Sequence, residues 1–193
     1  MSNISMTTSK RNAIVTVMLI SAFVSMLNQT ILNTALPAII KGLNITETTA
    51  QWLITGFMLV NGIMIPLTAF LMDKYSTRHL YIFSMAIFLI GSIVAAFSPT
   101  FTILMISRII QAIGAGILLP LMQFTVFTLF PAEQRGFAMG LAGVVVQSAP
   151  AIGPTLTGLF VDLFSWRMPF YLVSAIAAVA FDLIDRKSTR LNS

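Results

Sequence analysis

The sequence contains no cysteine, a single histidine and very few charged residues. Only 9% of its 193 residues are charged, against about 25% in an ordinary soluble domain. The missing cysteines exclude disulfides, thiolate metal sites and cysteine nucleophiles, and one histidine alone makes no metal site, so we expect no metal and no cofactor. Too few polar side chains remain to cover a water-soluble fold, which argues against a soluble enzyme. Intrinsic disorder is excluded because 57% of the residues are hydrophobic.

Long apolar runs make up most of the chain. A helix that spans a bilayer needs about 20 largely apolar residues, and the sequence supplies six such runs. We therefore predict an all-α membrane protein with six transmembrane helices and a cytoplasmic leader at residues 1–12. We interpret residues 185–193 as a non-native tail, because they resemble a translated sequencing adapter; the alternative is an ordinary cytoplasmic tail, which the basic residues there would fit. The predicted helices span about residues 13–36, 50–72, 79–98, 102–129, 137–160 and 168–184.

The basic residues lie singly or in pairs between these runs, so we interpret the net charge of +5 as a topology signal and expect no nucleic-acid partner. Cytoplasmic loops of membrane proteins carry more Lys and Arg than external loops do. With the N-terminus inside, the outer loops hold only Lys41 and Arg167. We therefore predict a multi-pass protein of the cell membrane with a cytoplasmic N-terminus. The inner segments then hold Lys10, Arg11, Lys74, Arg78 and Arg135.

One charged residue, Arg108, falls well inside an apolar run. A charge at this depth costs about 2.5 to 3.5 kcal/mol on insertion scales, so it is a functional candidate by default. Its expected depth, roughly 10 Å below the outer surface, is close to that of Asn28 at roughly 12 Å, and Gln111 shares its helix face at i+3. These residues predict a hydrated cavity, although buried amides also serve simply to join helices. Further amides that we assign to this substrate cavity are Asn33, Asn61, Gln123 and Gln147.

Two further segments suggest moving parts. In the fifth run, small residues recur at spacings of three or four, from Gly140 to Gly158, which predicts a face that a neighbouring helix approaches closely. Two prolines there should bend the helix, and the alternative is a static packing seam. We assign a conformational gate to Pro150, Gly153, Pro154 and Gly158, and a cytoplasmic latch, or else an ordinary solvated loop, to Asp73, Lys74 and Arg78.

In order and spacing, several of these residues are similar to motifs of the major facilitator superfamily. The closest likeness is to its fourteen-span drug/proton antiporters, which include lincomycin-resistance and multidrug exporters. Many relatives carry Asp where this chain has Asn28. The residues that carry the resemblance are Asn28 with Ala35-Leu36-Pro37, then Leu71 with Asp73, Lys74 and Arg78, then Leu104, Arg108, Gln111 and Gly114, then Gly153-Pro154 with Gly158, and Ser165-Trp166-Arg167 with Phe170.

The resemblance implies a bundle of two inverted three-helix repeats that forms the N-terminal half of a transporter. It implies a proton-coupled antiporter that exports lipophilic, often cationic compounds, with Arg108, Asn28 and Gln111 in proton coupling. The partners would be the lipid bilayer, protons, the substrate and a C-terminal half of the same polypeptide. Two alternatives are an uptake transporter for a small metabolite and a six-span scaffold that transports nothing. An intramembrane enzyme is not expected, because no nucleophile and base or paired carboxylates share one depth.

Overall fold

The computed structural model describes the backbone of residues 8–189 and the side chains of residues 11–183. This part of the chain consists of six helices joined by short connections, and no strand occurs in it. The prediction of an all-α fold with six helices is confirmed. The helices are α1 (Thr8–Leu43), α2 (Glu47–Lys74), α3 (Thr77–Ala96), α4 (Phe101–Leu129), α5 (Ala132–Leu163) and α6 (Met168–Thr189).

Polar residues mark the starts of three of these helices. Thr46, Ser76 and Thr100 stand at the N-caps of α2, α3 and α4, and each side-chain oxygen accepts a hydrogen bond from the backbone N–H three residues on. Such a bond satisfies one of the donors that a helix start leaves unpaired. The largest boundary error concerns α1, which we predicted to end near Leu36 but which continues through Pro37 to Leu43. The helix persists because packing of the buried Ile39 outweighs the one hydrogen bond that Pro37 removes.

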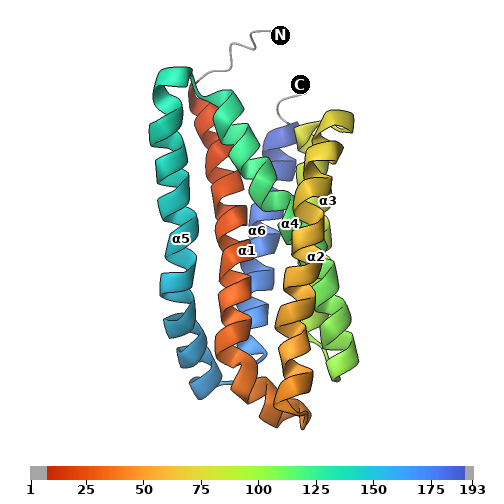
Figure 1. The fold of residues 1–193 in the computed structure, drawn as a ribbon. Coiled ribbons are helices and arrows are strands. Elements are labelled where there is room, and N and C mark those ends of the chain that lie inside the picture. Colours follow the sequence, from red (N-terminus) through yellow and green to blue (C-terminus); the bar gives the residue numbers. More distant parts are fainter. Residues whose placement is uncertain (1–7, 190–193) are drawn as a thin grey trace.

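Five helices, α1 to α5, are long and apolar enough to cross a membrane. In α6 the apolar stretch is shorter and covers Met168–Leu183. The bundle places the connections after α2 and α4 at the same end as both termini of the described chain, and the connections after α1, α3 and α5 at the other end (Figure 1). The predicted inner loops therefore share one end. The predicted tail begins within α6, and its residues 190–193 lie outside the described part.

The helices are not equally buried. Helix α4 runs obliquely through the bundle and packs against α3 and α2, while its neighbour α1 packs mainly against α5 (Figure 1). Half or more of the apolar window of α1, α3 and α4 is buried, but only 22% of the window in α2 and in α5. The bundle therefore presents α2 and α5 to its surroundings, and it surrounds α4, which carries Arg108.

Candidate functional site

Arg108 is the largest of the fully buried side chains, with 1% of its surface exposed. Its Nη1 donates a hydrogen bond of 2.8 Å to Oε1 of Gln111, one turn further along α4. Its guanidinium carbon lies 4.3 Å from the centre of the Phe57 ring on α2, which is the geometry of a cation–π contact. The predicted pairing of Arg108 with Gln111 is thus present, whereas Phe57 was not predicted, because nothing in the sequence shows which ring of α2 faces α4.

Gln111 is held from the other side by α3. Its Nε2 donates to Oγ of Ser92 at 3.0 Å, and the Ser92 hydroxyl donates in turn to the backbone oxygen of Phe88 at 2.8 Å. Because the single hydroxyl proton of Ser92 is already used, Ser92 can only accept from Gln111. This direction keeps the carbonyl oxygen of the Gln111 amide turned toward Arg108. Sequence analysis missed Ser92, since serine in a membrane helix commonly bonds only to its own backbone.

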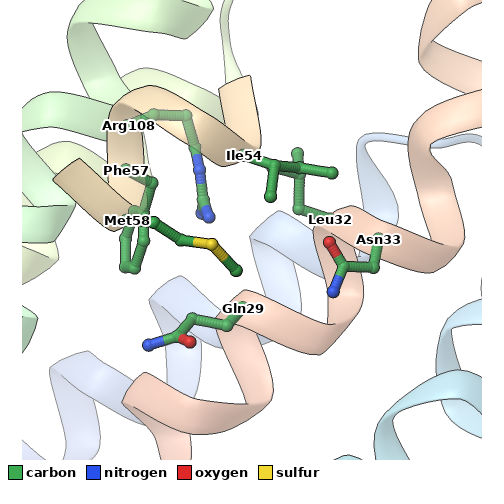
Figure 2. A pocket seen from close by; sticks show the side chains of 7 residues that line it. All are labelled: Gln29, Leu32, Asn33, Ile54, Phe57, Met58 and Arg108. Carbon is green, nitrogen blue, oxygen red and sulfur yellow. The ribbon is translucent and has the colours of Figure 1, made fainter. Parts of the chain in front are cut away.

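A small pocket opens beside the guanidinium of Arg108. Figure 2 shows Arg108 reaching into it from α4, with two amide side chains of α1, Gln29 and Asn33, on the opposite side. Its empty volume, including the open mouth, is about 240 Å³. Asn33 was predicted for the cavity, and Gln29 was missed. The complete lining is Gln29, Leu32, Asn33, Ile54, Phe57, Met58 and Arg108.

Asn28, which we expected to meet Arg108, does not line this pocket, although the next residue of α1, Gln29, does. Its side chain is fully buried, and neither amide atom has a hydrogen-bond partner among the described residues. The Nε of Arg108 is likewise buried and unpaired there. An unpaired buried polar group costs about 1–3 kcal/mol, so such groups call for an explanation. Because Asn28 and Arg108 are expected at the same depth, we take this part of the bundle as the candidate site.

Comparisons with known proteins agree with this geometry. The sequence profile described as Major Facilitator Superfamily matches residues 18–186. The chain belongs to the Major Facilitator Superfamily. Its structure also resembles the crystal structure of a bacterial homolog of the human lysosomal transporter Spinster in an inward-facing, unoccupied conformation, with a TM-score of 0.80 at 16% identity over 94% of this chain and 44% of that one. This likeness confirms the fold, one half of a major facilitator.

Several curated members of the superfamily are similar in sequence. An uncharacterized MFS-type transporter, YcnB of Bacillus subtilis, is 53% identical over 90% of this chain and 36% of its own length. The lincomycin resistance protein LmrB of Bacillus subtilis is 40% identical over 85% of this chain and 36% of its own. A probable multidrug resistance protein of Escherichia coli, EmrY, is 35% identical over 79% and 30%. The chain thus spans about a third of the length of these relatives.

The other amides that we assigned to the substrate cavity do not lie at the pocket around Arg108. Asn61 is half-buried where α2 crosses α4, and its side-chain oxygen lies 2.9 Å from the position that a Cβ on Gly116 would take. Gln123 and Gln147 are exposed on the outside of α4 and α5. None of the three lines the pocket around Arg108. When a whole helix is apolar, the sequence does not show which of its faces turns inward, so it does not show whether an amide on that helix is buried.

The predicted small-residue face of α5 is not the face that packs within this bundle. A Cβ added at Gly140, Gly143 or Gly158 would meet nothing within 4 Å. Close approach occurs instead at Gly153, where an added Cβ would collide with the side chain of Thr30 on α1. Helix α5 continues through Pro150 and Pro154, both of which are exposed. Its buried face consists of Ala138, Ala142, Val146, Ala149, Gly153 and Thr157.

The predicted latch residues Asp73, Lys74 and Arg78 are all exposed around the turn between α2 and α3. Among the residues that the structure describes, no ion pair joins them, and the Lys74 ammonium lies instead 4.5 Å from the centre of the Phe70 ring. The loop is closed by Ser76, which caps α3 and contacts the ring of His79 at 2.6 Å. The three charges are therefore available to a partner outside this bundle.

Proposed function

We propose that this chain forms the N-terminal half of a proton-coupled antiporter that exports lipophilic drugs. The observation that carries the proposal is Arg108, a buried charge at membrane depth beside a pocket, held by Gln111 and Ser92 on two packed helices. The 40% identity to a lincomycin resistance protein supports export of drugs over other kinds of transport. Met58, Leu32 and Ile54 give the pocket apolar walls that suit lipophilic substrates.

Proton coupling requires a group that takes up and releases the proton during the cycle. All six acidic residues of this chain lie in the first or last turn of an apolar segment or beyond it. We therefore assign the proton carrier to a carboxylate of the second half. Arg108, held by Gln111, supplies a fixed positive charge that attracts this carboxylate when its proton leaves, and Asn28 would take part through its unpaired buried amide. Return of a proton, or arrival of substrate, weakens that attraction and allows the two halves to move.

The second half would contact the faces of α2 and α5 that this bundle leaves exposed. Small residues at Gly140, Gly143 and Gly158 would let another helix approach α5 closely, and Pro150, Gly153 and Pro154 would let α5 adjust as the halves rock. The exposed Asp73, Lys74 and Arg78 would form ion pairs across the same interface when the inner side closes. The protein would lie in the cell membrane with its N-terminus in the cytoplasm, as the loop charges indicate.

A vesicle experiment tests the proposal. The full gene would be expressed, everted membrane vesicles acidified inside by respiration, and proton release recorded with a pH-sensitive dye when lincomycin or another lipophilic drug is added. We expect drug-driven proton release in the parent protein, loss of this release in Arg108→Ala, and no change in Lys41→Ala, which removes an exposed cation at a helix end.

Release that persists in Arg108→Ala at the parent rate would remove Arg108 from the mechanism. Substrate entry into intact cells, driven by the proton gradient, would instead indicate the uptake transporter. The scaffold alternative predicts that no substrate moves in either direction.

A further inference from the structure

We propose that the pocket beside Arg108 binds an oxygen acceptor of the substrate, preferring a carboxylate, and that it discriminates against cationic groups. The inference rests on the proposed transport function and defines the chemistry of its substrate at this position. It narrows the expectation that the transported compounds are often cationic. Three observations carry it: the unused donors of Arg108, the lack of an acidic side chain around them, and the amides on the opposite wall.

Most of the hydrogen-bonding capacity of Arg108 is unused. A guanidinium has five N–H donors, and among the described residues only one hydrogen bond is formed, from Nη1 to Gln111. The buried Nε has no partner. Figure 2 shows the end of the side chain directed into the pocket. A carboxylate or carbonyl placed there would accept from donors that otherwise have no partner, and the planar fork of arginine suits a carboxylate best.

Among the described residues, no acidic side chain lines the pocket to neutralise the charge of Arg108. The pocket is lined by one cation, two amides and four apolar or aromatic side chains. The face of Phe57, the one lining ring that could attract a cation, is already covered by Arg108 itself at 4.3 Å. An ammonium entering the pocket would therefore meet a fixed like charge.

The two amides complete the site. Gln29 and Asn33 reach the pocket from successive turns of α1, opposite Arg108. Each amide can donate through its nitrogen, so an oxygen held by Arg108 has further donors on the opposite wall. Gln111 does not line the pocket, and its amide is already engaged by Ser92 and Arg108. The arrangement matches a polar acceptor attached to a lipophilic body.

A matched set of probes tests the inference. Three compounds would carry the same dansyl fluorophore on the same alkyl chain, ending in a carboxylate, a primary amide or a trimethylammonium group. Export of each from vesicles that contain the full-length protein would be measured by fluorescence. We expect the carboxylate to be exported at least about tenfold faster than the trimethylammonium compound, the ratio that one charge-assisted hydrogen bond supports, with the amide between them.

Two variants locate the preference in this pocket. Asn33→Asp places a carboxylate on an exposed pocket wall and should reverse the order, so that the trimethylammonium compound is exported fastest. Asn44→Asp makes the same chemical change in the exposed connection between α1 and α2, and should keep the parent order. Arg108→Lys keeps the charge but loses the fork, and should retain the order with a smaller ratio.

The inference is overturned if the trimethylammonium compound is exported as fast as the carboxylate by the parent protein. It is also overturned if Asn33→Asp and Asn44→Asp behave alike. Binding of the three probes to purified protein, measured by fluorescence polarisation, gives the same test without transport: equal affinities reject the inference. Proton release in the same vesicles is a separate readout, so loss of coupling with an intact probe order would reject the antiport mechanism alone.

Discussion

The contact between α3 and α4 gives a sharp prediction about stability. Gly114 of α4 faces α3 so closely that an added Cβ would lie 2.6 Å from the backbone oxygen of Ser84 and 2.9 Å from the backbone nitrogen of Phe88. Backbone atoms cannot rotate away as the end of a side chain can, so Gly114→Ala forces the two helices apart. The same two helices are joined by the hydrogen bond between Ser92 and Gln111. Moving them apart should therefore weaken this bond at the candidate site as well.

The magnitude follows from two opposing terms. Overpacking of a tight contact costs about 1–3 kcal/mol, whereas replacing glycine by alanine inside a helix gains roughly 0.5–1 kcal/mol. Because the atoms in contact at Gly114 belong to the backbone, the clash outweighs the gain, and we expect a net loss of up to about 2.5 kcal/mol. At Gly143, where an added Cβ meets nothing within 4 Å, only the gain remains. Gly143→Ala should therefore stabilise this bundle by up to about 1 kcal/mol.

Both variants can be compared in one assay. This six-helix chain, without the second half, would be heated in detergent, and the fraction that stays monodisperse would be followed by fluorescence-detected size exclusion. We expect the midpoint of Gly114→Ala to fall by several degrees and that of Gly143→Ala to stay or rise. Equal shifts of the two midpoints in the same direction would refute the reasoning. The close packing at Gly114 and the open space at Gly143 would then make no difference to stability. A fall in Gly143→Ala alone would instead show that α5 is covered there by another helix.

Three other predictions concern the site, the outer end and the topology. Ser92→Ala removes the acceptor that orients Gln111 beside Arg108. It should slow drug-driven proton release by about tenfold and lower the free energy of unfolding by about 1–3 kcal/mol. An unchanged rate of proton release would show that Ser92 has no part in coupling. Arg167→Gln should lower the thermal midpoint, since Nη2 of Arg167 donates to the backbone oxygen of Ser98 at 2.9 Å and such charge-assisted bonds contribute about 1.5–3 kcal/mol; an unaltered midpoint would contradict this. Because the chain has no cysteine, Ser76→Cys and Thr46→Cys can each be labelled in intact cells with an impermeant maleimide; only the latter should react, and the opposite result would invert the topology.

Some of the site could be predicted because it depends on a single helix. Residues three apart along a helix share one face whatever surrounds them, so Arg108 and Gln111 could be paired from their spacing, and their hydrogen bond confirms it. The burial of Arg108 could be predicted too, because a charge in the middle of an apolar run cannot face lipid without a large penalty. The partners Phe57 and Ser92 come from other helices, and no spacing along the chain reveals them.

The sequence by itself determined that the chain is a bundle of membrane helices, because backbone groups in lipid must be satisfied within helices and the apolar runs have the right length. Only the tertiary structure decided which face of each helix turns inward. In water a polar stripe marks the outer face, but in a bilayer both faces are apolar, so the pattern carries little directional information. That is why hydropathy alone could not tell that Gln147 and Gly143 are exposed on this bundle while Gly153 is buried in it. Packing of Ala142 and Gly153 against neighbouring helices, rather than hydropathy, sets the orientation of α5.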